Sequence, residues 1–243
     1  MNVAVQPTRR IRSRTAIMAK GSGVKRNRSG RITRTKILDA AEQVFADKGI
    51  NGASLREIMI VAEVNIEAVN YYFGSKADLL KAVVSRRSAL INGARVTLLE
   101  ESIAKNNGIS TIDGWLRAFI APFVEAEGSA DPGWRNFMRV LNWVATAQGH
   151  DVLCQEIIQE TYGSMRQTFL DALAAALPDL SSEDVNWRYH CAITVLRTVV
   201  VARERAASPL GNFMDASSLD HMIAYIVPFL RGGFLAPPSG VGA

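Results

Sequence analysis

The side chains best suited to chemistry in this sequence lie close together in the segment 66–73. Glu67, Asn70 and Tyr71 recur at helical spacing and would share the outer face of a short helix. Asparagine can hydrogen-bond adenine through two atoms, glutamate can accept from the N4 of cytosine, and a tyrosine ring can lie against the methyl group of thymine. Val69 and Phe73 would face the opposite way, toward a core. These residue types predict direct reading of DNA base edges.

Residues that could hold a metal or support catalysis are present, but their spacing does not favour either role. His150, His190 and His221 lie far apart, without the i, i+4 spacing that places two ligands on one helical face. Cys154 and Cys191 have no cysteine neighbour at metal spacing and are expected to be buried, reduced thiols. The sequence contains no phosphate loop, dinucleotide fingerprint or nucleophile elbow. We therefore predict no metal, no cofactor and no enzyme activity; an enzyme would show turnover and no salt-dependent affinity for DNA.

The residues around the segment 66–72 predict two short helices joined by a tight turn. Ser54 and Glu57 have the spacing of a capping box, so a first helix should begin at Leu55. Asn65 is a good N-cap for the second helix, 66–72. This is the plan of a helix-turn-helix, in which the second helix lies in the major groove and the first crosses the DNA backbone.

The residues of these helices resemble the TetR family of bacterial transcriptional regulators. The resemblance covers roughly 31–84 and holds in order and spacing across three consecutive helices. The matching residues are Ile37–Phe45, Ser54–Ile58, Val64, Val69, Tyr72–Phe73 and Ser75–Leu80. The run 69–76 is similar to a subset of the family with an Asn-Tyr-His-Phe-Gly-Ser-Lys segment. The resemblance implies an all-α chain with an N-terminal helix-turn-helix head and a C-terminal helical body.

One residue of the turn departs from the family pattern. The family usually has glycine where this chain has Glu63, at a position where a left-handed backbone is common. Glu63 therefore implies either a slightly different turn or a small cost in strain.

Several residues around the recognition helix are candidates for DNA phosphates. By resemblance, Tyr72 and Lys76 match positions that hold phosphates, and Lys76 lies in the first turn of its helix, where free amides favour an anion. Thr33 and Arg34 begin the first helix and should lie near the backbone. The start of the second helix completes the predicted interface with Ser54, Leu55 and Arg56. Arg56 could instead be a solvated charge or pair with a neighbouring acid.

The N-terminal thirty residues differ in charge from the rest of the chain. Residues 1–30 hold eight arginines and lysines and no acidic residue, so the formal charge of +5 for the whole chain leaves −3 for everything after Gly30. Without hydrophobic periodicity, 1–30 is expected to be a disordered basic arm that can bind phosphates. A merely disordered tail is the alternative, and Met18 could also serve as a start. No apolar stretch of a secretory signal follows the charges.

Helical periodicity along the remainder predicts about nine helices and no strand. We expect a DNA-binding domain over 31–78, an effector and dimerisation domain over 79–235, and a disordered tail over 236–243. No apolar run approaches the length of about 20 residues that a membrane span needs. A cytoplasmic, nucleoid-associated protein is expected.

A single small head reads too few bases to be selective, so the resemblance implies a homodimer on a pseudo-palindromic operator. The last two predicted helices, 184–206 and 218–230, have broad apolar faces. In the resembled family the corresponding pair builds a four-helix dimer interface. Alternatively, these faces bury only against their own chain.

Members of the family often enclose a small-molecule pocket in the body, whose occupancy releases DNA. The candidates are large apolar side chains and a few polar ones among them. They are Phe119, Phe123, Phe137, Arg139, Leu141, Tyr162, Met165, Phe169, His190 and Arg197. We expect an apolar or aromatic effector; Arg139 and Arg197 could receive an acidic group or be surface charges. Repression is the family tendency, and a constitutive or architectural DNA binder without an effector is the alternative.

Overall fold

A computed structural model of the chain describes residues 18–147, 151–204 and 219–239, and these contain only helices and their connections. The helices are α1 (Met18–Gly52), α2 (Leu55–Ala62), α3 (Ile66–Phe73), α4 (Lys76–Lys105), α5 (Ile112–Glu127), α6 (Pro132–Ala147), α7 (Val152–Ala176), α8 (Ser182–Glu204) and α9 (Leu219–Phe234). The prediction of an all-α chain of about nine helices is confirmed for this part of the sequence. None of these helices is long and apolar enough to span a membrane.

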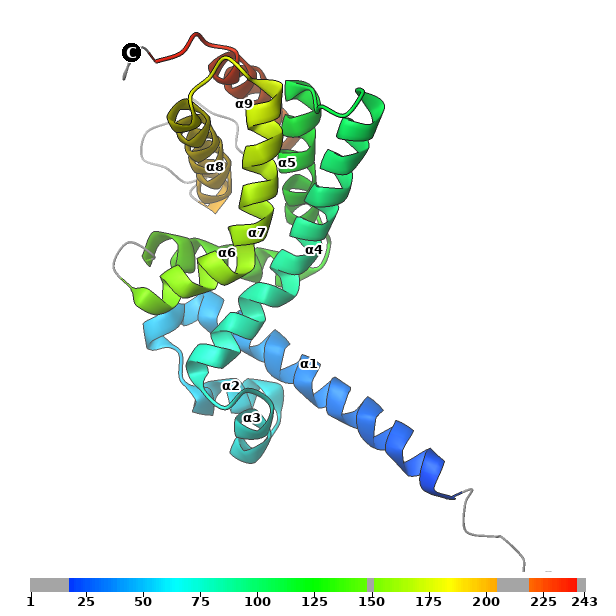
Figure 1. Ribbon diagram of the computed structural model, residues 1–243. Helices are drawn as coiled ribbons and strands as arrows, with labels where there is room; N and C mark the ends of the chain where they lie inside the picture. Colours follow the sequence, from blue (N-terminus) through cyan, green and yellow to red (C-terminus); the bar gives the residue numbers. More distant parts are fainter. Residues whose placement is uncertain (1–17, 148–150, 205–218, 240–243) are drawn as a thin grey trace, which may run out of the picture.

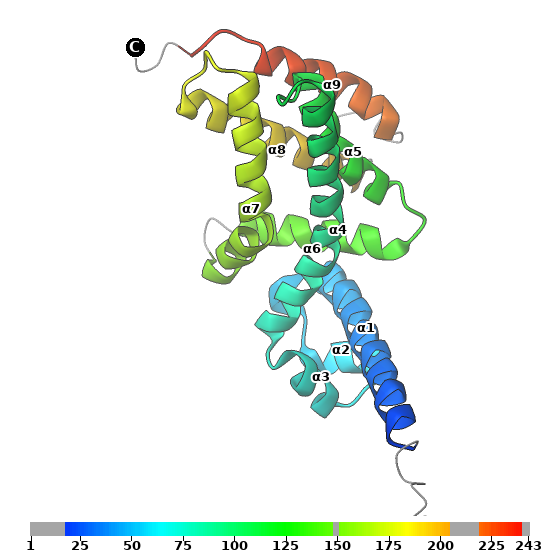
Figure 2. The same ribbon diagram turned by 45° about the vertical axis from the view of Figure 1, so that its right-hand side comes forward.

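The helices form a head and a body that α4 connects (Figure 1). The head consists of α2, α3, the packed part of α1 and the first turns of α4. Helix α4 then continues into the body, where it packs against α5, α6 and α7. Helix α6 lies across the junction and packs against α1. The turned view in Figure 2 shows α8 and α9 at the end of the body that lies away from the head.

Local side-chain caps set the starts of the head helices as predicted. The Ser54 hydroxyl accepts from the amide of Glu57 at 3.2 Å, and the Glu57 carboxylate accepts from the amide of Ser54 at 3.2 Å. The Asn65 side-chain oxygen accepts from the amide of Ala68 at 2.9 Å. Because each cap satisfies an amide that the helix itself cannot bond, α2 and α3 begin at defined residues.

The turn between α2 and α3 keeps a left-handed residue despite the absence of glycine. Glu63 has φ 55° and ψ 45°, and its amide donates to the carbonyl of Ile60 at 3.3 Å. The amide of Val64 donates to the carbonyl of Met59 at 3.1 Å. A non-glycine residue in this region costs about 1 kcal/mol. Of the two possibilities for Glu63, a different turn or a small cost in strain, the second therefore applies, and the turn is retained.

Two apolar clusters lie along the molecule, and the boundary between them is not the head–body junction. The head cluster includes Phe45, Ile58 and Val69, but it also contains Val140 and Val144 of α6. It further includes Cys154 and Ile157 at the start of α7. The side chains of the body thus complete the core of the head.

The body cluster surrounds the buried Trp115. Its ring stacks on Phe119 with centroids 5.0 Å apart and meets Phe169 and Phe234 edge-on at 5.3 and 5.1 Å. The Trp115 indole N–H donates to the carbonyl of Phe169 at 2.9 Å, so its polar atom is satisfied within the core. These contacts fix α5, α7 and α9 around one aromatic centre.

The structure corrects two predictions about the ends of the chain. Residues 18–30, predicted to be disordered, form the first part of α1, whereas residues 1–17 lie outside the described residues. Extending a helix that packing already holds adds one hydrogen bond per residue, without a new nucleation cost.

The predicted C-terminal tail is also ordered over 236–239, while 240–243 lie outside the described residues. The Arg188 guanidinium donates to the carbonyls of Phe234, Ala236 and Pro237 at 2.6 to 2.9 Å. The amide of Ser239 donates to Asp184 at 3.2 Å. One arginine fork thus holds a segment whose composition alone predicts no structure.

The two cysteines differ in environment. Cys154 is buried in the head cluster, and burial raises the pKa of its thiol. Cys191 is exposed on α8, so the prediction that both thiols are buried is wrong for Cys191. An exposed thiol arises there because α8 keeps one face outside the body core.

Candidate nucleic-acid interface and internal cavity

Helix α3 presents the predicted base-reading side chains outward. Glu67, Asn70 and Tyr71 are exposed, with Tyr71 82% accessible, whereas Val69 and Phe73 are buried in the head. The predicted division of α3 into an outer and an inner face is therefore confirmed. Three groups capable of contacting base edges lie on one short helix, whose backbone the head core holds fixed.

Tyr72 lies at the place where α3, α4 and the extended part of α1 meet. Its ring is half-buried and contacts the Tyr71 ring edge-on, with centroids 5.0 Å apart. A methyl group added at Gly30 would lie 3.0 Å from the Tyr72 hydroxyl, so glycine allows this close approach of α1. Lys76 follows in the first turn of α4 and is partly exposed. A phosphate bound by Tyr72 and Lys76 would thus lie near the base of the basic arm.

The remaining phosphate candidates lie at the starts of α2 and of the packed part of α1. Ser54 and Arg56 are exposed, but Leu55 is half-buried and packs against the head cluster. No described acidic side chain pairs with Arg56, which does not support the ion-pair alternative. Thr33 donates its hydroxyl to the carbonyl of Ser29 at 3.1 Å.

Arg34 is exposed on α1, and its guanidinium lies over the Phe73 ring, 5.1 Å from the centroid. The ring holds the side chain on the side of the head where α3 lies. Arg34 is therefore placed near the recognition helix rather than on the opposite side of α1.

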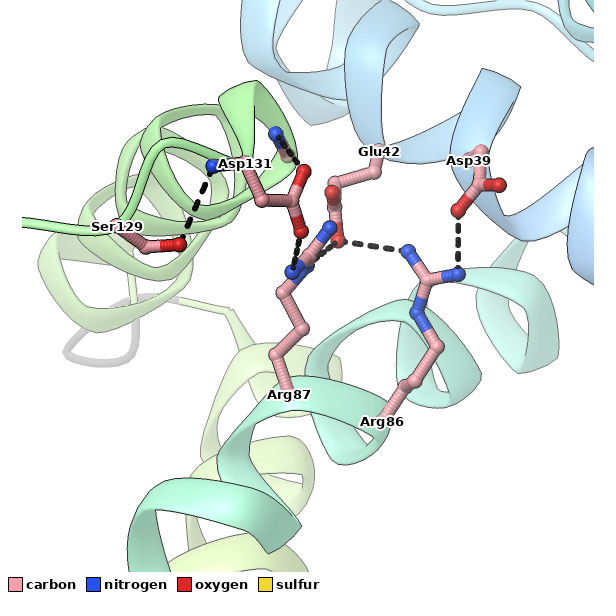
Figure 3. Close-up of polar contacts among 7 residues, drawn as sticks. Asp39, Glu42, Arg86, Arg87, Ser129 and Asp131 are labelled. Atoms are coloured by element: carbon pink, nitrogen blue, oxygen red, sulfur yellow. Dashed lines mark hydrogen bonds and ion pairs between the residues drawn. The ribbon is translucent and has the colours of Figure 1, made fainter. Parts of the chain in front are cut away.

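Charged side chains connect the head to the body across a shared glutamate (Figure 3). Glu42 of α1 is only 1% exposed and accepts from Arg86 at 2.9 Å and from Arg87 at 2.7 Å, both on α4. Arg86 also pairs with Asp39 at 2.6 Å, and Arg87 pairs with Asp131 at 2.8 Å. We call these five residues the junction network.

Asp131 joins the junction network to the start of α6. Its second oxygen accepts from the amide of Gly133 at 2.8 Å, so one carboxylate caps α6 and binds Arg87. The hydrogen bond from Arg87 contributes most to lowering the pKa of Asp131, and the hydrogen bond from Gly133 adds to it. A methyl group at Gly133 would lie 1.8 Å from the guanidinium of Arg87, so the contact requires glycine.

Sequence reasoning did not identify the junction network as functional. The available signal was Glu42, an acid directly after the apolar Ala41 and close to Phe45 in the stripe of α1. Its partners lie more than forty positions away, and no local pattern links them.

A cavity of about 270 Å³ opens within the body between α4, α5, α6, α7 and α8. Seven of the ten predicted pocket residues line it: Phe119, Phe123, Leu141, Tyr162, Met165, His190 and Arg197. Its volume lies just below the range of about 300–1,000 Å³ that is usual for small-molecule sites, and its walls are mainly apolar. A compact ligand would fit there.

Three predicted pocket residues do not line this cavity. Phe137 and Phe169 are fully buried in the body cluster, where they fill space between helices. Arg139 instead pairs with Asp47 of α1 at 3.1 Å, which adds another link between body and head. Helical spacing identifies inward-facing residues but does not distinguish those that pack from those that border a void.

Sequence reasoning missed two charged residues of the cavity wall, Arg95 and Arg166. Arg95 of α4 is 6% exposed, its Nε donates to the carbonyl of Phe119 at 2.9 Å, and its guanidinium lies 4.6 Å from the centroid of the Phe119 ring. Its position four residues after Ile91 and four before Leu99, both buried, was the signal. A charge in an apolar stripe at this spacing must face the interior.

Two tyrosines of the cavity wall keep their phenol groups neutral. Burial raises the pKa of Tyr162, whose hydroxyl is 2.7 Å from that of Ser88, and burial raises the pKa of Tyr189 to about 12. Both are therefore hydrogen-bonding groups rather than anions at neutral pH.

Two family models match the chain, one for each part of the molecule. The model described as "Bacterial regulatory proteins, tetR family" matches residues 37–83. The model described as "Tetracyclin repressor-like, C-terminal domain" matches residues 117–233. The matched ranges contain the exposed face of α3 and most of the cavity wall.

Curated relatives align over a limited part of the chain. The chain is 36% identical over 77 residues to NicS, an HTH-type transcriptional repressor of Pseudomonas putida, covering 32% of this chain and 36% of NicS. It is 41% identical over 54 residues to BepR, an HTH-type transcriptional repressor of Brucella suis, covering 22% of this chain and 26% of BepR. These alignments span about a quarter to a third of the relatives' length.

Solved structures share the fold over almost their whole length. A TetR-family transcriptional regulator from Rhodococcus sp. superimposes with a TM-score of 0.58 at 14% identity, covering 84% of this chain and 99% of that one. A tetR-family regulator from Shewanella sp. PV-4 gives 0.59 at 13% identity, covering 82% and 96%. With models of one family matching both head and body, the chain belongs to the tetR family of bacterial regulatory proteins.

Proposed function

We propose that this protein is a ligand-responsive transcriptional repressor that binds a pseudo-palindromic operator as a homodimer. The observation that carries the proposal is α3, which holds Glu67, Asn70 and Tyr71 exposed on one face while its other face is buried in the head. Such a helix supplies direct base contacts when it lies in the major groove. Repression at an operator implies a cytoplasmic protein associated with the nucleoid.

Groups around α3 support orientation by the DNA backbone. Tyr72 and Lys76 flank the C-terminal end of α3, and Ser54 and Arg56 lie at the start of α2. Thr33 and Arg34 lie on α1. Phosphate contacts from these elements would fix the register of α3 without selecting a sequence. The amide of Leu55, at the first position of α2, is the part of that residue suited to a phosphate.

Exposed apolar residues on α8 and α9 support dimerisation through these helices. Trp187 of α8 and Tyr225 and Phe229 of α9 are each more than 60% exposed, although they are among the largest apolar side chains in the body. Clusters of such residues mark interaction sites on most proteins. A second copy of the same pair of helices would cover them and place two heads at the opposite end of the dimer.

The position of the cavity supports control by a ligand. Arg95 lines the cavity on α4, and the same helix carries Arg86 and Arg87 of the junction network at the head. A ligand with higher affinity for one arrangement of α4 would shift the population of DNA-competent dimers. A constitutive DNA binder would show no such response, and adding ligand to the operator complex separates the two functions.

The first test is selection of binding sites from random duplex DNA by the purified protein at physiological salt. We expect a palindrome whose half-sites lie about one helical turn apart, or a multiple of it. Weak binding that selects no sequence and disappears as salt rises would show that basic residues alone bind DNA, and the proposal would be wrong.

Substitutions on and beside α3 test the orientation of the recognition helix. Asn70→Ala should relax base preference at one operator position by about 1–3 kcal/mol, because it removes a base contact. Lys76→Ala should weaken binding to all sequences alike and reduce the dependence on salt by about one counterion. Titrations against the operator and its point variants measure both effects. An Asn70→Ala protein with unchanged affinity and preference would contradict the proposed orientation.

A further inference from the structure

We propose that the effector is an organic carboxylate with a compact apolar body, and that Arg95 binds its carboxylate group. This inference rests on the proposed function, since it assigns a ligand class to the cavity that would control DNA binding. It follows from the hydrogen bonds of Arg95, the charges of the cavity wall and the shape of the space.

The charge of Arg95 has no counter-ion among the described residues. Its only hydrogen bond there runs from Nε to the carbonyl of Phe119, and no carboxylate lies within ion-pair distance. The titratable groups beside it are the phenols of Tyr162 and Tyr189, whose raised pKa values keep them neutral. Burial lowers the pKa of Arg95, but arginine keeps its proton in proteins.

Buried charges in proteins are normally paired, because removing an ion from water is costly. The junction network obeys this rule, because Glu42 forms ion pairs with Arg86 and Arg87, and each of these arginines forms a further ion pair with an aspartate. Arg95 is 6% exposed, but among the described residues it only donates to a carbonyl and lies over an aromatic ring. Its two terminal nitrogens donate to no described residue, and Arg95 lines the cavity.

The charged residues of the cavity wall are all basic. Arg95, Arg166 and Arg197 line the cavity together with His190, and no aspartate or glutamate of the described chain joins them. Arg166 is exposed and already donates to Asn186 at 2.9 Å, which places it at the rim rather than inside. This charge distribution favours an anion, and a guanidinium fork matches the planar geometry of a carboxylate.

The apolar part of the cavity wall determines what the rest of the ligand can be. Phe119, Phe123, Met138 and Leu141 surround the space with apolar surface. The volume of about 270 Å³ suits a single ring or a short acyl chain rather than a large conjugate. The single buried guanidinium matches one negative charge.

The test compares carboxylates with their neutral amides on the full-length protein. The probes are benzoate and benzamide, phenylacetate and phenylacetamide, and hexanoate and hexanamide, at equal ionic strength and neutral pH. Thermal melting and calorimetric titration report binding, which raises the melting temperature of the folded state. We expect at least one carboxylate to bind about tenfold or more tightly than its amide. Equal binding of acids and amides, or no binding by any carboxylate, would overturn the inference.

Variants locate the contact. Arg95→Met should weaken carboxylate binding about tenfold to a hundredfold, whereas Arg166→Met, at the rim, should retain it. Arg95→Lys keeps the positive charge but loses the two parallel donors of the guanidinium, so it should bind carboxylates more weakly than wild type but more tightly than Arg95→Met. It also provides the test of this contact if Arg95→Met fails to fold. Carboxylate binding that survives both Arg95 substitutions would disprove the role of Arg95.

The inference and the proposed function fail separately. Carboxylate binding without release of the selected operator would contradict ligand-responsive repression and leave the assignment of the ligand class intact. Operator release by the amides and not by the acids would contradict the assignment of the ligand class and leave ligand-responsive repression intact.

Discussion

At the residue scale, Glu42 is the buried acid at the centre of the junction network. It is almost completely buried and accepts hydrogen bonds from two arginines of another helix. Glu42→Gln removes the negative charge while leaving two half-buried guanidinium groups with weaker partners. We expect a loss of about 3 kcal/mol in the free energy of unfolding, measured by urea denaturation.

The control for this substitution is Asp39→Asn, which affects the exposed end of the same network. Among the described residues Asp39 pairs only with Arg86, and it is well exposed, so its loss should cost less than about 1 kcal/mol. Equal destabilisation by the two substitutions would show that burial of Glu42 is not the source of its effect.

Asp131 gives the junction a dependence on pH. The hydrogen bonds from Arg87 and Gly133 lower its pKa below the ordinary aspartate value, so its stabilising contribution is complete at neutral pH. It is lost as the pH falls from about 4 toward the lower pKa of the folded state. Urea denaturation at about pH 7 and about pH 3 should therefore show a smaller acid-induced loss of stability in Asp131→Asn than in wild type. Equal losses in both proteins would contradict this assignment.

At the element scale, the close approach of α6 to α1 and α4 depends on a residue without a side chain. A methyl group at Gly133 would overlap Arg87 and lie 2.7 Å from Glu42. Gly133→Ala should displace the start of α6 and lower the free energy of unfolding by about 1–3 kcal/mol. Gly93→Ala on α4 is a matched control, because its added methyl group meets nothing within 4 Å and should stabilise the helix by about 0.5–1 kcal/mol. Stabilisation by both substitutions would show that α6 adjusts freely.

The elements that sequence predicts best here are those with local determinants. Capping by Ser54 and Asn65 and the apolar spacing of α3 involve neighbours within one turn, so the head helices and their exposed faces were predictable. The junction network joins α1 to α4 and α6 across more than forty residues, and no periodicity records such a contact. The position of the cavity was partly predictable from aromatic stripes, but the inward orientation of Arg95 required recognising a charge within an apolar stripe.

At the scale of the whole molecule, α8 and α9 leave Trp187, Tyr225 and Phe229 exposed. Phe229→Glu on α9 should separate the proposed dimer, because a charge at an apolar interface loses its hydration without gaining a partner. Light scattering coupled to gel filtration would then show the mass of one chain, and operator affinity should fall because one head reads too few bases. Leu90→Glu, at an exposed position on α4, should leave the dimer intact. A Phe229→Glu protein that retains the dimer mass would place the interface elsewhere.

The sharing of apolar residues between head and body has a consequence for protein engineering. Val140, Val144, Cys154 and Ile157 belong to α6 and α7 by sequence but to the head by packing. A chimera that transplants only 31–78 onto another regulator would expose the apolar surface that these side chains cover. The smallest portable DNA reader in this chain is therefore a discontinuous unit, which includes α6 and the first turns of α7.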